Sequence, residues 1–163
     1  MAIRMIRQEG DEILKKKSKP VEVIDNKIQE LIEDMLETMH KKDGVGLAAV
    51  QVGILKRVIV IDTYEEGTEP YVFINPEIVE RKGERELDEG CLSFPNKFAK
   101  VVRPDQIKVK AIDREGKRIT LTAKGLLAQA ICHEVDHLEG IVFTDIMIPG
   151  TLETVTPEEN KKI

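Results

Sequence analysis

Hydrophobic residues recur at intervals of three and four in two stretches of the chain, which is the spacing of one buried helix face. The first stretch follows Asp25, a residue type that caps helices, and closes near Gly44. Its apolar positions are Ile28, Leu31, Ile32, Met35, Leu36 and Met39. The second stretch starts at Gly125 and stops before Gly140, with apolar positions at Leu126, Leu127, Ala130, Ile131 and Leu138. The pattern therefore predicts two amphipathic helices.

Between these stretches, short segments alternate apolar and polar residues or are rich in β-branched residues, as β-strands are. They cover residues 58–61, 71–74, 77–86, 107–112 and 118–122. An acidic loop over 64–70 separates the first two segments, and 113–117 has the composition of a hairpin turn. Residues 44–55 are expected to form an apolar loop. The middle of the chain is therefore predicted to be mostly antiparallel sheet, which together with the two helices gives an α+β fold.

The length of 163 residues fits one domain, and a composition of 41% hydrophobic and 34% charged residues is typical of a globular protein. We expect this domain to span residues 1–150. Residues 151–163 are polar and are interpreted as a surface tail. The net charge is −5, from 25 Lys and Arg against 30 Asp and Glu. Because nucleic-acid binding depends on clustered Lys and Arg, this balance argues against direct nucleic-acid binding.

The sequence predicts neither a membrane span nor a secretory signal. Its longest uncharged run, 44–55, has 12 residues, whereas a helix that crosses a bilayer needs about 20. Arg4, Arg7, Glu9 and Asp11 interrupt the N-terminus before an apolar signal core could form. We therefore expect a cytoplasmic protein. With only two cysteines a disulfide framework is not expected, which directs attention to thiol or metal chemistry.

The second predicted helix carries the sequence HExxH at residues 133–137. Because they are four residues apart on a helix, the imidazoles of His133 and His137 point the same way and can bind one metal ion. Glu134 lies about 100° from His133 around the helix, where a carboxylate can accept a proton from water at the metal. The competing interpretation is a solvated helix with two surface histidines, and the motif favours the metal site. We expect the antiparallel strands to pack around this central HExxH-bearing helix.

A catalytic metal site of this kind has three protein ligands and one open position, so a third ligand has to be found. In the metzincin pattern the third ligand would be a histidine at position 143, but the chain has Phe143, which cannot ligate. A zincin of the thermolysin type would use a downstream acid, and Glu158 or Glu159 falls in a suitable part of the sequence. This alternative corresponds to a metallo-endopeptidase with an acidic third ligand.

A cysteine is the other candidate for the third ligand. Cys91 lies in the segment EGCLSFP at 89–95, where glycine and proline favour a bend that exposes a thiol. Taken alone, such a cysteine is more often a buried filler of the core. Cys132, next to the HExxH motif, points about 100° away around the helix and fits the filler role better. Arg103 could pair with Glu89 to hold the cysteine segment, or it could be solvated. The residues alone leave the acidic alternative and Cys91 open.

Three segments, in the same order, closely resemble motifs of the peptide deformylase family. They are GVGLAAVQ at 44–51, EGCLS at 89–93 and HEVDHL at 133–138. The resemblance covers nearly the whole chain. It implies a metal-dependent amidase that removes the formyl group from the N-terminal formyl-methionine of newly made polypeptides. One departure is Cys132, where the family often has glutamine, and we expect it to affect only local packing.

The resemblance implies that Cys91, His133 and His137 are the metal ligands and that Glu134 is the acid and base. One divalent ion is expected, and the likeness to the family favours Fe(II). Thiolate and imidazole donors also suit Zn(II), Ni(II) or Co(II). The non-enzyme alternative is a metal-binding or ribosome-docking module with a dead site, and the joint presence of Glu134 and Gln51 argues against it.

By the same resemblance, the amide of Gln51 and the backbone N–H of Leu92 would form an oxyanion hole, since a tetrahedral oxyanion needs donors fixed where its charge develops. Glycines 44 and 46 would let an extended peptide pair with this segment like an added strand. We expect a mainly apolar slot for an unbranched methionine side chain. The expected substrate-binding residues are Val45, Gly46, Leu87, Gly90, Leu126, Gln129 and Ala130. The expected partners are formyl-methionyl N-termini of nascent peptides, and the ribosome is a further candidate.

Overall fold

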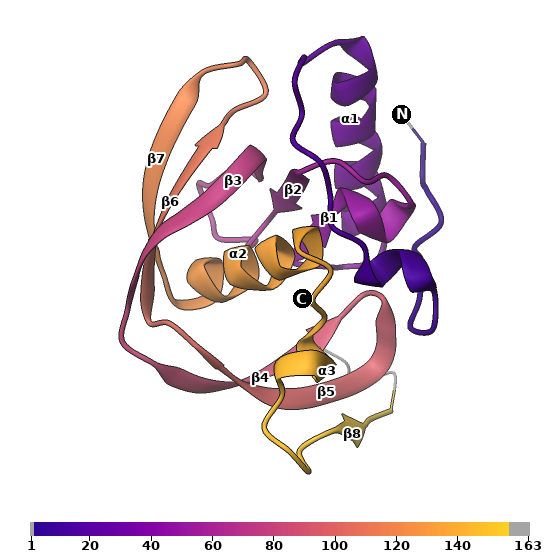
Figure 1. The fold of residues 1–163 in the computed structure, drawn as a ribbon, viewed down its shortest axis with the longest axis vertical. Helices are drawn as coiled ribbons and strands as arrows, with labels where there is room; N and C mark the ends of the chain where they lie inside the picture. The colour runs from indigo at the N-terminus through magenta and orange to yellow at the C-terminus, as the bar shows by residue number, and fades with distance from the viewer. Residues whose placement is uncertain (1, 157–163) are drawn as a thin grey trace.

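The computed structural model describes residues 2–156, which form two antiparallel sheets and several helices (Figure 1). In chain order the elements are η1 (Glu12–Lys15), α1 (Asn26–Lys41), β1 (Gly46–Ala48), η2 (Ala49–Val52), β2 (Val58–Ile61), β3 (Tyr71–Lys82), β4 (Arg85–Cys91), β5 (Phe94–Arg103), β6 (Gln106–Ile112), β7 (Arg118–Lys124), α2 (Gly125–Leu138), α3 (Phe143–Ile146) and β8 (Glu153–Thr154). One sheet has the strand order β1-β2-β3-β6-β7, and the other has the order β4-β5-β8. The predicted mixture of helices and antiparallel sheet is therefore confirmed.

Strand β1 lies at one edge of the five-stranded sheet, where β2 is its neighbour within that sheet. Gly46 pairs with Ile61, and Ala48 pairs with Ile59. This strand and η2 lie where the sequence predicted an apolar loop, so that prediction was wrong. The reason is that all three residues of β1 are buried, and a short strand without alternation gives no period-2 signal.

The segments predicted as separate strands at 71–74 and 77–86 belong to β3 and to the start of β4. Asn75 has a φ of +52°, and the pairing with β6 shifts between Ile74 and Glu77. Such a shift is a β-bulge, which interrupts the alternation of side chains while the strand continues. The real break comes at Gly83, where φ is +71°. The predicted boundaries were therefore wrong, although the strand character of these residues was correct.

The β4–β5 hairpin forms most of the second sheet, and the sequence pattern did not predict β5. Pairing runs from Arg85 opposite Arg103 to Gly90 opposite Phe98. Strand β8 then adds to β5 through Glu153 and Thr154, so the start of the polar segment expected as a tail pairs with the sheet. The rest of that expected tail, 157–163, lies outside the described residues. The hairpin matters for function because β4 ends at Cys91.

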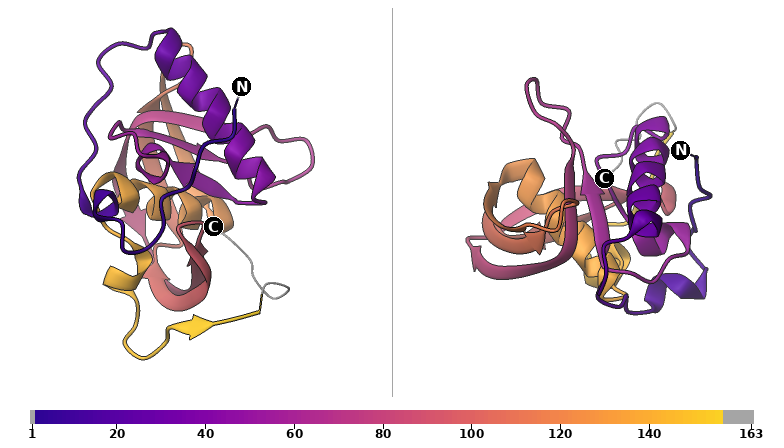
Figure 2. Two further views of the ribbon diagram at one scale, coloured as in Figure 1. Left: turned by 90° about the vertical axis from the view of Figure 1, so that its right-hand side faces the viewer. Right: turned by 90° about the horizontal axis from the view of Figure 1, so that it is seen from above.

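Helix α1 begins and ends where its sequence pattern predicted. The Asp25 side chain accepts a hydrogen bond from the backbone N–H of Ile28 at 3.1 Å, which caps the helix. The chain before η1 runs beside this helix (Figure 2). Two hydrogen bonds hold it there, from the backbone N–H of Ala2 to Asp34 and from that of Arg4 to Thr38. The apolar face of α1 packs on β1 and β2.

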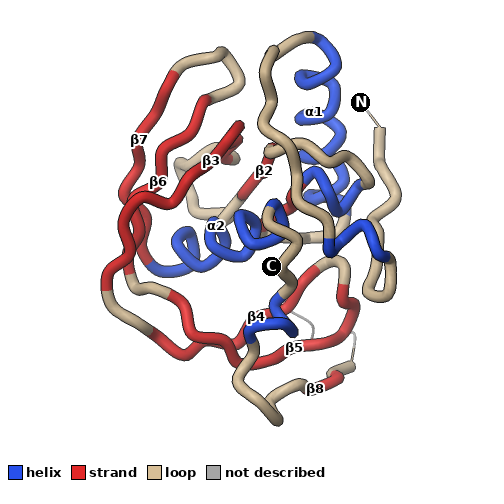
Figure 3. The backbone as a smooth tube through the Cα atoms, viewed as in Figure 1, coloured by secondary structure: helices blue, strands red, loops and turns tan. Residues whose placement is uncertain are grey.

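Helix α2 carries the HExxH sequence and also begins and ends as predicted. Gly140, with a φ of +75°, follows its last turn. The helix packs against strands of the five-stranded sheet on one side and is hydrogen-bonded to β4 on the other (Figure 3). None of the helices within residues 2–156 is long and apolar enough to cross a membrane.

Candidate metal and catalytic site

The cysteine at the end of β4 and the two histidines of α2 come together inside the protein. Each of Cys91, His133 and His137 offers one ligand atom, and these atoms all lie within 4.8 Å of one another. Cys91 Sγ is 3.3 Å from His137 Nε2. All three residues are buried, with exposed fractions of 2%, 2% and 0%. One thiol and two imidazoles in this arrangement could hold a metal ion.

Glu89, two residues before Cys91, orients one of these histidines. Its Oε2 lies 2.6 Å from His133 Nδ1, which leaves Nε2 as the nitrogen that can face a metal. Glu89 is completely buried, and its two carboxylate oxygens accept hydrogen bonds from Arg103 at 3.0 and 2.6 Å. Burial alone would raise the pKa of Glu89, but His133 and Arg103 outweigh burial and lower it to about 2. The expected pairing of Arg103 with Glu89 is therefore confirmed.

The two imidazoles have different electrostatic surroundings. Burial disfavours the charged form of His133, but the carboxylate of Glu89 outweighs burial and raises the pKa of His133 well above its ordinary value. Burial and the neighbouring His133 lower the pKa of His137 well below its ordinary value. Within the described residues, His133 Nε2 and His137 Nδ1 are buried without hydrogen-bond partners. Buried polar atoms without partners are rare, and a metal ion would satisfy the nitrogen of His133.

Hydrogen bonds fix α2 against the β4–β5 hairpin at three points along the helix. Gln129 donates to the backbone carbonyl of Asp88 at 3.1 Å, one turn before the contact between His133 and Glu89. Arg103 Nη1 donates to Asp136 at 2.7 Å. Arg103 therefore connects the carboxylate behind His133 to the next turn of the same helix, which restricts how the helix and the hairpin can move relative to each other.

Glu134 lies next to the candidate metal-binding group of Cys91, His133 and His137 and against β1. It is completely buried, and its Oε2 is 4.0 Å from His133 Nε2. Neither carboxylate oxygen has a hydrogen-bond partner among the described residues, and burial raises the pKa of Glu134 to about 7. A Cβ atom at Gly46 would lie 2.6 Å from Glu134 Oε2. The close approach of β1 to Glu134 therefore requires glycine at position 46.

Gln51 reaches the same site from η2 and is buried. Its side-chain oxygen accepts a hydrogen bond from the backbone N–H of Ala48 at 3.0 Å. Its amide nitrogen donates to Ser93 Oγ at 3.0 Å and lies 3.5 Å from Cys91 Sγ. Sequence reasoning did not single out Ser93, although the hydroxyl sits in the same EGCLS segment as the cysteine. These contacts place the Gln51 amide directly beside the thiol.

The other residues expected to contact substrate lie on or beside β1, on β4 and on α2. Val45, Gly46, Leu87 and Gly90 lie on or beside β1 and β4, and Leu92 directly follows Cys91. Leu126 is 40% exposed, whereas Gln129 and Ala130 are buried. Ala130 is packed in the main hydrophobic cluster, and Gln129 is hydrogen-bonded to β4. The two candidate acids Glu158 and Glu159 lie outside the described residues, and Phe143 is buried in the core.

Comparison with known proteins shows the family of this chain. A family model described as polypeptide deformylase matches residues 3–152. The chain belongs to this family, the peptide deformylases. The peptide deformylase of Lachnoclostridium phytofermentans is 51% identical over 162 residues, which is 99% of each chain. That of Acetivibrio thermocellus is 56% identical over 148 residues, 91% of this chain and 85% of the relative.

A solved structure gives the same result for the fold. The crystal structure of a peptide deformylase from Legionella pneumophila matches this chain with a TM-score of 0.87 and 48% sequence identity. The match covers 91% of this chain and 88% of the other. Peptide deformylases are metal-dependent enzymes that remove the N-terminal formyl group, and the buried thiol and imidazoles fit that chemistry.

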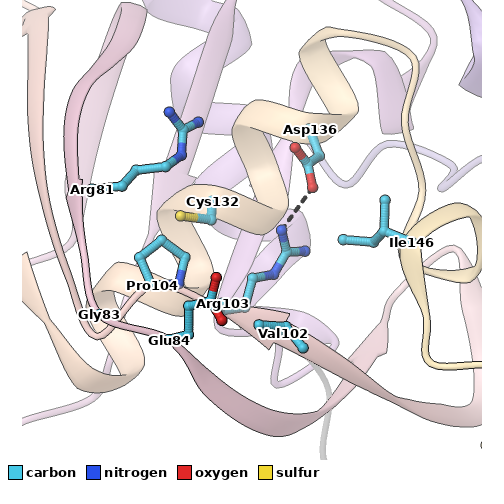
Figure 4. A pocket seen from close by; sticks show the side chains of 9 residues that line it. All are labelled: Arg81, Gly83, Glu84, Val102, Arg103, Pro104, Cys132, Asp136 and Ile146. Carbon is cyan, nitrogen blue, oxygen red and sulfur yellow. Dashed lines mark hydrogen bonds and ion pairs between the residues drawn. The ribbon is translucent and has the colours of Figure 1, made fainter.

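A cavity of about 810 Å³ opens on the outer face of the HExxH helix of this deformylase (Figure 4). Cys132 and Asp136 line it from the helix, and Arg103 lines it from β5. Cys132 is only 4% exposed, and burial raises the pKa of its thiol to about 11, so the thiol stays protonated. None of the expected substrate-binding residues lines this cavity. The cavity is therefore distinct from the expected slot.

Replacing Gly46 with Ala should destabilise the protein, because the new methyl group meets the carboxylate of Glu134. Overpacking of this kind lowers the free energy of unfolding by about 1 to 3 kcal/mol. In a Glu134→Ala background the opposing carboxyl is missing, so the Gly46→Ala change should cost less than about 0.5 kcal/mol there. Urea unfolding of the four proteins measures this difference. Equal destabilisation in both backgrounds would show that Glu134 does not set the requirement for glycine.

Proposed function

We propose that Cys91, His133 and His137 hold one divalent metal ion, Fe(II), at the centre of the deformylation site. The observation that carries this proposal is the buried convergence of one thiol and two imidazoles, one of which is oriented by a carboxylate on its other nitrogen. These donor types suit several divalent metals, including Zn(II), Ni(II) and Co(II), and the likeness to the family favours Fe(II). When bound, such an ion polarises the formyl carbonyl and makes water easier to ionise near neutral pH.

In this proposal Glu134 moves the proton. Its carboxylate is buried beside His133, has no hydrogen-bond partner among the described residues, and is therefore free to contact a water molecule at the site. Glu134 accepts the proton of the attacking water and then passes it to the amine nitrogen that leaves the formyl group. Because residue 46 is a glycine, β1 can lie against this carboxylate, and β1 is the strand with which the substrate pairs.

Gln51 and the backbone N–H of Leu92 stabilise the oxyanion in this proposal. Attack on the formyl carbon turns its carbonyl oxygen into an oxyanion, and fixed donors lower the energy of that charge as it develops. Gln51 qualifies because its amide nitrogen lies 3.5 Å from Cys91 Sγ and its side-chain oxygen is anchored by Ala48. One N–H of the amide donates to Ser93, and the other N–H, which points to Cys91 Sγ, is then the donor to the oxyanion.

The substrate is a formyl-methionyl N-terminus of a nascent polypeptide. Because β1 is an edge strand of the five-stranded sheet in the described structure, an extended peptide can pair with it, and Gly46 brings the peptide close to Glu134. The methionine side chain enters the slot formed by Val45, Leu87, Gly90, Leu126, Gln129 and Ala130.

We further propose that the reaction takes place in the cytoplasm, with the ribosome as a candidate partner. The HExxH helix is the central element of a catalytic domain at 1–150, followed by a polar tail at 151–163.

Replacing Cys91 with Ala should remove one metal ligand and lower metal content and formate release together. Cys132→Ala is the matched control, because that cysteine is equally buried but faces away from the ligand group, and it should keep both. Metal analysis and formate release from formyl-Met-Ala-Ser, prepared anaerobically, measure the two effects. A metal-loaded, active Cys91→Ala protein would overturn the ligand assignment. Internal cleavage of the unformylated peptide, without formate release from its formylated twin, would favour an endopeptidase instead.

Replacing Gln51 with Leu keeps the approximate size of the side chain and removes the donor. If Gln51 stabilises the oxyanion, kcat should fall by about 10² to 10³-fold while metal content stays near normal. Gln106→Leu, in β6 and away from the site, is the control and should leave kcat unchanged. Steady-state kinetics with formyl-Met-Ala-Ser, together with a melting curve on each sample, provide the measurement. A folded, metal-loaded Gln51→Leu enzyme with kcat within about threefold of the original would contradict the assignment.

A further inference from the structure

Gly46 lies against Glu134, and the segment 44–46 that ends at this glycine is held by residues that follow β2. The hydroxyl of Tyr64 donates a hydrogen bond to the backbone carbonyl of Gly44 at 2.7 Å. The backbone N–H of Asp62 donates to the carbonyl of Val45 at 2.8 Å. Two consecutive carbonyls are therefore fixed immediately before the edge strand β1 begins at Gly46.

The Tyr64 side chain is itself held by charged and aromatic neighbours. Asp62 accepts a hydrogen bond from the backbone N–H of Tyr64 at 2.8 Å, and its other oxygen lies 2.8 Å from His40 Nε2. The rings of His40 and Tyr64 meet edge to face, with their centroids 5.9 Å apart. These contacts connect the end of α1, the end of β2 and segment 44–46.

The backbone at Tyr64 indicates that this arrangement is imposed by its contacts. Tyr64 has a φ of +58°, in the left-handed region that a bulky side chain rarely adopts. Such a conformation persists only where the surrounding contacts hold it. The residue is 51% exposed, so burial in the core contributes little to its position. Among the described residues, the hydrogen bond to Gly44 and the contacts with Asp62 and His40 hold Tyr64 in this conformation.

We propose that Tyr64 is a positioning residue for peptide binding, acting through the backbone of segment 44–46. This inference rests on the proposed function, in which the substrate pairs with β1. Loss of the Tyr64 hydroxyl would free the carbonyl of Gly44 and loosen the segment that the peptide has to meet. The three metal-ligating residues lie on β4 and α2, not on this segment, so metal binding would be unaffected.

Tyr64→Phe removes the hydroxyl and keeps the ring. We expect KM for formyl-Met-Ala-Ser to rise three- to tenfold, because one net hydrogen bond is lost from the organised segment, with kcat within twofold and metal content unchanged. The inhibition constant of the product peptide Met-Ala-Ser should rise by the same factor. Tyr71→Phe is the matched control. The ring of Tyr71 stacks on Phe73 in β3, its hydroxyl makes no hydrogen bond in the described structure, and its replacement should leave KM unchanged.

These measurements distinguish a failure of the positioning role of Tyr64 from a failure of the proposed deformylation activity. If the original enzyme releases formate but Tyr64→Phe has KM within 1.5-fold of the original, or loses activity only through kcat, the positioning role is wrong and the deformylation proposal stands. A lower melting temperature with unchanged KM also overturns the positioning role, since it would indicate a purely structural one. If the original, metal-loaded enzyme releases no formate, the proposed function fails, and this inference fails with it.

Discussion

A carboxylate that is completely enclosed by protein has to be matched by positive charge and hydrogen bonds, because an unpaired buried charge costs several kcal/mol. Glu89 is in this position, and the protein matches it with Arg103 on one side and His133 on the other. Its place in β4, two residues before Cys91, means that the same carboxylate sets the distance between the thiol and the HExxH helix. The orientation of His133, the docking of α2 on the hairpin and the position of Cys91 all depend on this one group.

The opposite side of the site is organised by backbone and not by charge. Gly46 lets β1 approach Glu134 more closely than a residue with a Cβ atom could without a shift of that side chain, and η2 immediately afterwards places Gln51 beside Cys91. The loop after β2 holds the start of this edge through Tyr64. The candidate metal-binding group therefore lies between the charge-matched hairpin and the edge strand β1, which is a suitable arrangement for the proposed pairing of an extended peptide with this strand.

The sequence predicted the parts of this structure that depend on short-range periodicity. Both long helices, the cap at Asp25 and the spacing of the two HExxH histidines follow from residues within one or two turns. The proposed third ligand, Cys91, could not be chosen from the residues alone, because it lies far from the histidines in sequence and the fold brings β4 and α2 together. Resemblance to a family supplied that choice. The edge strand β1 and the β-bulge at Asn75 were missed, because neither produces the alternation that identifies a strand.

The metal affinity of a Glu89→Gln variant tests the central role of the buried carboxylate most directly. Glutamine keeps the size of the side chain but removes the charge that orients His133 and matches Arg103. Loss of such an outer partner lowers metal affinity by about 10 to 100-fold, and competition with a chelator measures it on protein shown to be folded. Asp88→Asn, at the exposed neighbouring position paired with Lys100, should leave the affinity unchanged. A folded Glu89→Gln protein that binds metal within twofold of the original affinity would contradict the account.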